Sequence, residues 1–185
     1  MKLILLRHEK RQDYPGFYST LTKQGFIDSI KLINKFKDLN IYKIYCSPLV
    51  RTVQTIYPYC VVNKKKINID YALYEYKLHP YFLMEQKNYD VEDLNNKYLC
   101  KIINKKYNSK FKNIDFNYFL LETDSHLEKR SKIFLNNLLK NSNLKDKTIL
   151  VVSHKGVINK IKNLLNIYVD PNNEFKKGHF EIINI

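Results

Sequence analysis

The sequence has 185 residues, of which 44% are hydrophobic and 27% are charged, a balance close to that of ordinary globular proteins. This composition excludes wholesale disorder, and no apolar run approaches the roughly 20 residues that a membrane-spanning helix needs. The formal net charge is +14, which raises the question of a polyanionic partner.

The first part of the chain predicts strands that alternate with helices. The apolar run Lys2–Leu6 predicts a short buried strand. Thr22 opens a helical pattern that gathers four apolar residues on one face. Ile41–Cys46 predicts a second strand, and Ser47-Pro48 predicts the start of the next helix because proline suits the first helical turn. Ile67–Ile69 predicts a third strand at an edge of the sheet. The four apolar residues of the first helix are Phe26, Ile30, Ile33 and Phe36.

The middle of the chain is less regular. Residues 76–118 are rich in Tyr, Asn and Lys, and they predict one helix around Glu92–Lys106. We expect this insertion, at about residues 76–120, to shape the roof of a pocket.

The last part of the chain returns to alternation. Ser125–Glu128 has the spacing of a capping box and predicts a helix that runs to about Lys140. Thr148–Val152 is the clearest strand in the sequence, and a helix follows it from near Gly156. Phe180–Ile185 predicts a final strand.

This order of elements predicts the α/β class: a three-layer α/β/α sandwich with a mainly parallel central sheet. The sequence contains no repeat, low-complexity tail or linker, so we expect a single domain over residues 1–185.

Unusual side chains follow the predicted strands. Arg7-His8 comes directly after the first strand, Arg51 lies shortly after the second, and Ser153-His154 follows the strongest. Ligands of open α/β sheets bind beyond the carboxyl ends of the strands, so we expect these groups to meet. Guanidinium groups can clamp phosphate oxygens bidentately, and the helix near Gly156 adds backbone N–H donors. The pattern therefore predicts an anion-binding pocket.

The positive charge itself is weaker evidence. The chain contains 28 Lys, 21 Asn, 20 Ile and 15 Tyr, all of which have A/T-rich codons, and its lysines are spread along its length. We therefore attribute most of the charge to compositional bias and do not predict nucleic-acid binding. Only four arginines occur, so each indicates a position that needs the guanidinium fork.

Targeting and redox signals are sparse. The apolar start of the chain is too short before Arg7 for the core of a signal peptide. Cys46, Cys60 and Cys100 lie far apart without the spacing of a zinc site. We expect a cytoplasmic protein with no membrane partner, no metal and no cofactor.

Five ordered motifs resemble those of the histidine phosphatase superfamily, in its phosphoglycerate-mutase-like branch. The resemblance runs from about Lys2 to Ile161. The motifs are Leu6-Arg7-His8-Glu9, Leu21-Thr22-Lys23-Gln24-Gly25, Ser47 to Thr55, Leu73-Tyr74-Glu75 and Ser153 to Ile158.

The resemblance implies a phosphoglycerate-mutase-like fold and a metal-independent phosphomonoesterase. His8 resembles the nucleophile that takes the phosphoryl group onto a ring nitrogen. Arg7, Arg51 and His154 resemble the clamp that binds the phosphate oxygens. Glu75 resembles the acid/base carboxylate that protonates the leaving oxygen and then activates water. Such a covalent intermediate splits one hard displacement into two easier ones.

Other residues are secondary candidates for substrate binding. Lys155 either adds a cation near the phosphate or projects into solvent, and Arg11, Ser19 and Thr20 are candidates for the pocket mouth. Glu122 and Arg130 resemble a helix-start Glu and a later Arg of the family, and we interpret both as structural.

The chain departs from the family pattern at three places near the site, one of which is Lys155, where the family often has the first of two glycines. The family usually has Gly and then Glu after the Arg-His pair, where this chain has Glu9 and Lys10. Glu9 either crowds the pocket or points away from it. In the mutases Arg follows the acid/base Glu, whereas Tyr76 follows here, and residues 76–118 contain no Arg. Phosphatase activity is therefore favoured over mutase activity.

Three readings of function remain. The first is a phosphatase acting on a small anionic phosphorylated substrate, either a metabolite or a phosphopeptide. The second is a cofactor-dependent phosphoglycerate mutase. The third is a catalytically idle phospho-ligand or partner-binding module, which need not keep the full set of site residues. The sequence predicts neither the substrate nor the oligomeric state.

Overall fold

The structure is a computed structural model of the whole chain, and it describes all residues except 14–15, 17, 77–96, 112–121 and 171–174. None of its described helices is long and apolar enough to cross a membrane. The Glu92–Asn96 part of the predicted central helix and most of the predicted pocket roof lie outside the described residues.

A five-stranded sheet forms the centre of the described structure, with the order β3-β2-β4-β1-β5. The three pairings that join β1 to β4, β4 to β2 and β2 to β3 are parallel, and only β5 runs antiparallel, against β1. The predicted mainly parallel sheet is confirmed, and so is the edge position of the third strand. The strands are β1 (Lys2–Arg7), β2 (Ile41–Cys46), β3 (Ile67–Ile69), β4 (Thr148–Ser153) and β5 (Phe180–Asn184).

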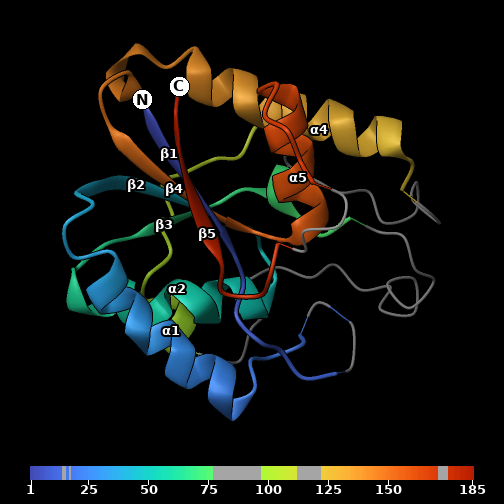
Figure 1. The fold of residues 1–185 in the computed structure, drawn as a ribbon. Helices are drawn as coiled ribbons and strands as arrows, with labels where there is room; N and C mark the ends of the chain where they lie inside the picture. The colour runs from blue at the N-terminus through green and yellow to red at the C-terminus, as the bar shows by residue number, and fades with distance from the viewer. Residues whose placement is uncertain (14–15, 17, 77–96, 112–121, 171–174) are drawn as a thin grey trace.

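Helices cover both faces of this sheet (Figure 1). On one face lie α1 (Lys23–Lys35) and α2 (Val50–Val62), and on the other lie α4 (Asp124–Leu139) and α5 (Lys155–Leu164). The remaining helical pieces are short: α3 (Lys97–Cys100), η1 (Tyr71–Leu73) and η4 (Ser142–Leu144). The three-layer α/β/α sandwich is therefore confirmed.

Two hydrophobic clusters fill the layers, one on each face of the sheet. Alternate residues of β1 separate between them: Ile4 and Leu6 pack with α1 and α2, whereas Leu3 and Leu5 pack with α4 and α5. Side chains of a strand alternate between its two faces, so an uninterrupted apolar strand must be covered on both. This double covering holds the end of β1 rigidly in the middle of the sheet.

Several local predictions were wrong. In α1, Phe26 and Ile30 are 45% and 46% exposed, because the helix turns its small residues toward the core, with Gly25 and Ser29 buried. A side chain at Gly25 would collide with the Lys10 carbonyl oxygen, at 2.1 Å from an added Cβ. The tight approach of the helix to this loop therefore decides its orientation, rather than its hydrophobic pattern.

Two helix starts were also misplaced. Helix α2 begins at Val50, two residues after the proline at position 48, with Leu49 as its N-cap. Helix α4 is capped by Thr123, whose hydroxyl accepts a hydrogen bond from the His126 backbone N–H, so the predicted cap at Ser125 lies inside the helix. Serine and threonine are both favourable N-cap residues, so residue type alone does not distinguish Ser125 from Thr123. In the described part of the predicted central helix, helical structure ends at Cys100.

Candidate active site

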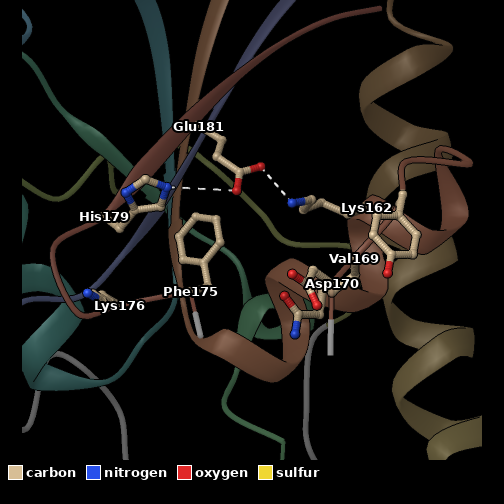
Figure 2. A pocket seen from close by; sticks show the side chains of 9 residues that line it. Lys162, Val169, Asp170, Phe175, Lys176, His179 and Glu181 are labelled. Carbon is tan, nitrogen blue, oxygen red and sulfur yellow. Dashed lines mark ion pairs between the residues drawn. The ribbon is translucent and has the colours of Figure 1, made fainter. Parts of the chain in front are cut away.

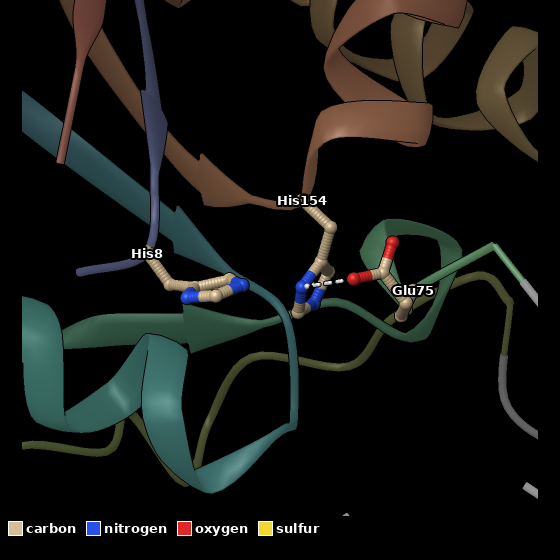
Figure 3. Close-up of side chains that lie close together, drawn as sticks. All are labelled: His8, Glu75 and His154. Carbon is tan, nitrogen blue, oxygen red and sulfur yellow. Dashed lines mark ion pairs between the residues drawn. The ribbon is translucent and has the colours of Figure 1, made fainter. Parts of the chain in front are cut away.

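The carboxyl ends of the inner strands place four charged or titratable side chains together. His8 follows β1, His154 follows β4 and is the N-cap of α5, and Arg51 is the second residue of α2, which follows β2. Glu75 lies just after η1 and approaches His154 from beyond the sheet (Figure 3). His8, Arg51 and His154 are each no more than 1% exposed, so the strand ends hold them rigidly inside the molecule.

A backbone hydrogen bond orients the ring of His8. Its Nδ1 lies 2.7 Å from the backbone carbonyl oxygen of Glu9. A carbonyl oxygen can only accept, so Nδ1 carries the proton and Nε2 keeps a lone pair. The His8 ring extends toward His154, with ring centroids 5.2 Å apart (Figure 3). His8 is therefore held in the tautomer that a nucleophile at Nε2 requires.

The carboxylate of Glu75 bridges the other two members of the cluster. Its Oε2 lies 3.1 Å from Nδ1 of His154 and 3.6 Å from Nη2 of Arg51. The opposite ring nitrogen of His154, Nε2, lies 2.9 Å from the Ser47 hydroxyl. Glu75 keeps a side-chain exposure of 22%, so it is the member of the cluster with the most access to solvent.

Burial and neighbouring charges shift the pKa values of the cluster. Burial, the neighbouring His154 and the positive charge of Arg51 hold the pKa of His8 well below its usual value. Burial also lowers the pKa of His154 to about 4, although Glu75 opposes this shift. Burial favours the neutral form of Glu75, but the neighbouring His154 and Arg51 outweigh it and hold the Glu75 pKa well below its usual range. At neutral pH the cluster thus holds neutral histidines and an ionised glutamate.

Two buried donors in this region lack hydrogen-bond partners among the described residues. They are Nε of Arg51 and the hydroxyl of Ser19, which is fully buried. Ser19 and Arg51 are neighbours, because both donate to the Gly16 carbonyl oxygen, the first from its backbone N–H and the second from Nη1 at 2.8 Å. Buried polar groups are normally hydrogen-bonded, so a cluster of unpaired donors indicates a site that binds an acceptor-rich anion.

The remaining predicted site residues lie around this cluster. Arg7 ends β1 beside His8, and its guanidinium donates to the Phe175 carbonyl oxygen at 2.6 Å. Arg11 donates to the backbone carbonyl of Gln12. Thr20 and Lys155 are half-buried, and Lys155 is the first residue of α5. Of the nine predicted residues, the structure thus brings His8, Arg51, Glu75 and His154 into one cluster, with Ser19 beside Arg51.

A buried network supports the Glu75 segment from behind. The Arg130 guanidinium forms a bidentate pair with Glu122, at 2.6 and 2.9 Å. It also donates to the backbone carbonyl oxygens of Ala72 at 2.6 Å and Tyr74 at 2.7 Å. The structural interpretation of these two residues agrees with this geometry, but the sequence did not reveal that they hold the loop that carries Glu75.

Two hydroxyl residues of the site were missed as individuals, Ser47 and Thr55. Ser47 contacts His154, and the Thr55 hydroxyl donates to the Arg51 carbonyl oxygen at 2.7 Å. Both lie within the motif from Ser47 to Thr55, and membership of that motif could have identified them as site residues.

The cluster also has the spacing of a metal site. One donor atom each from His8, Glu75 and His154 lie within 4.8 Å of one another. The Arg51 guanidinium, however, stands 3.6 Å from the same carboxylate and would repel a bound cation. The balance of charge favours an anion here, and we assign none of these residues a metal-ligand role.

Away from the cluster, a hollow of about 460 Å³ lies between α5 and β5 (Figure 2). Lys162 and Glu181 form an ion pair of 2.7 Å across it, and Phe175 packs against His179. Because the Phe175 carbonyl holds Arg7, this wall also helps to fix the end of β1.

Comparisons with known proteins agree with this geometry. The model of the histidine phosphatase superfamily (branch 1) matches residues 6–177. No curated protein sequence matches the chain.

Solved structures match over nearly the whole chain. An ecdysone phosphate phosphatase from Bombix mori is 14% identical, with a TM-score of 0.74, over 99% of this chain and 88% of that one. The alpha-ribazole phosphatase of Shigella flexneri is 20% identical, with a TM-score of 0.70, over 100% and 91%. A mycobacterial glucosyl-3-phosphoglycerate phosphatase is 15% identical, with a TM-score of 0.67, over 99% and 89%. At these identities the likeness concerns the fold.

Proposed function

The chain belongs to the histidine phosphatase superfamily and is a histidine-dependent phosphatase, and we propose that it hydrolyses phosphate monoesters through a phosphohistidine on His8 without a metal ion. One observation carries this proposal. A buried histidine with a free Nε2 faces an arginine, a second histidine and a carboxylate, and Nε of the arginine has no hydrogen-bond partner among the described residues.

In the first step, Nε2 of His8 attacks phosphorus. The bond from nitrogen to phosphorus forms as the bond from phosphorus to the leaving oxygen breaks. Arg51 and His154 hold the phosphate oxygens, with Arg7 at the end of β1 as a further clamp residue. Phosphoryl transfer depends on positioning and electrostatic stabilisation, and buried donors fixed by strand ends provide both.

Glu75 handles the proton in both steps. It protonates the leaving oxygen, and in the second step it takes a proton from the water that attacks the phosphohistidine. Its carboxylate is ionised while Arg51 and His154 are its neighbours. A bound phosphate draws those donors away and brings negative charge close, and both effects raise the Glu75 pKa. Substrate binding thus prepares Glu75 to act as an acid.

The test is hydrolysis of an aryl phosphate in the presence of a chelator. We expect turnover by the unmodified protein, complete loss in His8→Ala, and normal turnover in the control His126→Ala, whose imidazole lies on the first turn of α4. Quenching with alkali and detergent during turnover of a ³²P-labelled substrate should trap protein-bound label that is stable to base and lost in acid, as a phosphoramidate is. Turnover that survives in His8→Ala, or that the chelator abolishes, would refute the proposal.

The substrate class is narrower than the reaction alone implies. The similar structures include an ecdysone phosphate phosphatase, an alpha-ribazole phosphatase and a glucosyl-3-phosphoglycerate phosphatase, all named for small molecules. We propose a small phosphorylated metabolite in preference to a phosphopeptide, and a panel of both kinds separates them. The same panel should include 3-phosphoglycerate with a bisphosphoglycerate primer, where formation of 2-phosphoglycerate would instead indicate a mutase.

A further inference from the structure

Glu9, the residue that departs from the family pattern, points away from the cluster and into the protein. Its side chain is buried, with only 5% of the residue exposed. Among the described residues the carboxyl group has neither an ion pair nor a hydrogen bond. A buried carboxylate without a partner is costly, so the surroundings favour the neutral acid.

The carboxyl group of Glu9 packs against Gly178. A Cβ atom added to Gly178 would lie 2.2 to 2.4 Å from the carboxyl atoms of Glu9, far inside van der Waals contact. Gly178 has a φ of +72°, which other residues adopt only with strain. Its backbone N–H donates to the carbonyl oxygens of His8 at 3.1 Å and Arg7 at 3.2 Å. The Glu9 side chain therefore occupies the space directly beneath the peptide that anchors His8.

The backbone of Glu9 is part of the same arrangement. Its carbonyl oxygen accepts the Nδ1 proton of His8, and its N–H donates to the Thr55 hydroxyl at 2.9 Å. That hydroxyl in turn donates to the carbonyl oxygen of Arg51. Both the nucleophile and the helix of the phosphate clamp are thus tied to the residue whose side chain fills the space under Gly178.

We propose that Glu9 is a positioning residue for His8 and acts in its neutral form, by packing against Gly178 and so fixing the carbonyl oxygen that orients the His8 ring. This inference rests on the proposed function of His8. Glu9, which stands where the family usually has glycine, thus positions the His8 ring in this chain.

Ionisation of Glu9 would weaken this support. The charged groups that act on its carboxyl from α1 are Asp28, Lys35 and Lys31, whereas the C-terminal segment presents Gly178 and α2 presents the neutral Thr55. Burial, with help from Asp28, raises the pKa of Glu9 to about 7. Above this pH the Glu9 carboxylate is drawn toward water and toward Lys31 and Lys35. The carboxyl group then no longer packs against Gly178.

The experiment compares Glu9→Gln with the unmodified protein across pH, using an aryl phosphate. Glutamine has the shape of the neutral acid and cannot ionise. The ratio of kcat in the variant to kcat in the unmodified protein should rise about tenfold between about pH 6 and pH 8, as the neutral fraction of Glu9 falls. The inhibition constant of inorganic phosphate, which Arg51 and His154 set, should change little. The control Glu128→Gln, on the exposed side of α4, should give a flat ratio.

The proposal would be overturned if the kcat ratio of Glu9→Gln to the unmodified protein did not change with pH. It would also be overturned if the inhibition constant of inorganic phosphate changed as much as kcat. Should Glu9→Gln not fold, the pair Gly178→Ala and Gly178→Ala with Glu9→Ala gives the same answer. The strain at Gly178 is common to both proteins, so the double variant should recover kcat only if the Glu9 carboxyl occupies that space. Equal kcat values would count against the proposal. Its failure is distinct from failure of the proposed function, which His8→Ala alone decides.

Discussion

Replacing Arg130 with methionine should destabilise the protein and weaken the hold on Glu75. Arg130 is 3% exposed, and Glu122, its bidentate partner, is 7% exposed. The substitution leaves the Glu122 carboxylate buried without its guanidinium. It also removes the donors to the carbonyl oxygens of Ala72 and Tyr74, which lie in the segment that leads to Glu75.

The expected loss follows from these contacts. Removing one partner of a buried ion pair costs about 3–5 kcal/mol, because the remaining charge is uncompensated. The lost carbonyl bonds act within the same network, so they do not add in full. A domain of this kind has a free energy of unfolding of roughly 5–15 kcal/mol, so the loss is a large fraction of the total. A shift in Tm of about 10 °C is expected at this chain length.

Urea denaturation followed by circular dichroism measures the loss directly. The double variant Arg130→Met with Glu122→Gln should be more stable than Arg130→Met alone, since no charge is then left buried. In both variants kcat should fall at temperatures where the protein is folded, because the Glu75 segment has lost its anchors. A loss below about 1 kcal/mol for Arg130→Met, or a double variant no more stable than the single one, would refute this account of the network.

Two further predictions concern Glu75. Glu75→Gln should lower kcat for alkyl phosphates by about 10²- to 10⁴-fold and for aryl phosphates with good leaving groups by much less, as measured by steady-state kinetics on both substrate classes; equal losses would contradict its role as an acid. Binding of inorganic phosphate near pH 6 should make the protein take up protons. The bound anion raises the depressed pKa values of Glu75 and His154 toward the solution pH. Calorimetry in buffers of different ionisation enthalpy measures this uptake, which should shrink in Glu75→Gln, and proton release would contradict the scheme.

The layers of the fold could be predicted because the strands carry their own signal. Lys2–Leu6 and Thr148–Val152 are apolar without interruption, and such strands are covered on both faces wherever they occur. Orientation within a layer depends on contacts between distant residues. Phe26 and Ile30 have the stronger apolar signal, but only Gly25 fits against the Lys10 carbonyl, and no local pattern reveals that approach.

The candidate site divides in the same way. His8, Arg51, Glu75 and His154 could be predicted as one cluster because parallel strands end at one edge and the motifs mark those ends. The supporting contacts could not, since each joins positions far apart in the sequence. Gly178 lies 169 residues after Glu9, and nothing near either position indicates that one fills the space left by the other.

The contrast between arginine and lysine connects composition to the site. Arg51 and Arg130 are buried, and each bonds more than one group at once: Arg51 contacts the Gly16 carbonyl and Glu75, and Arg130 contacts Glu122 and two carbonyl oxygens. A lysine could supply the charge at these positions but not a planar fork with fixed donors. Lys31 and Lys132, by contrast, form exposed pairs on their own helices. Such pairs contribute little to stability, so a net charge of +14 can accumulate on the surface while the chemistry depends on the few guanidinium groups inside.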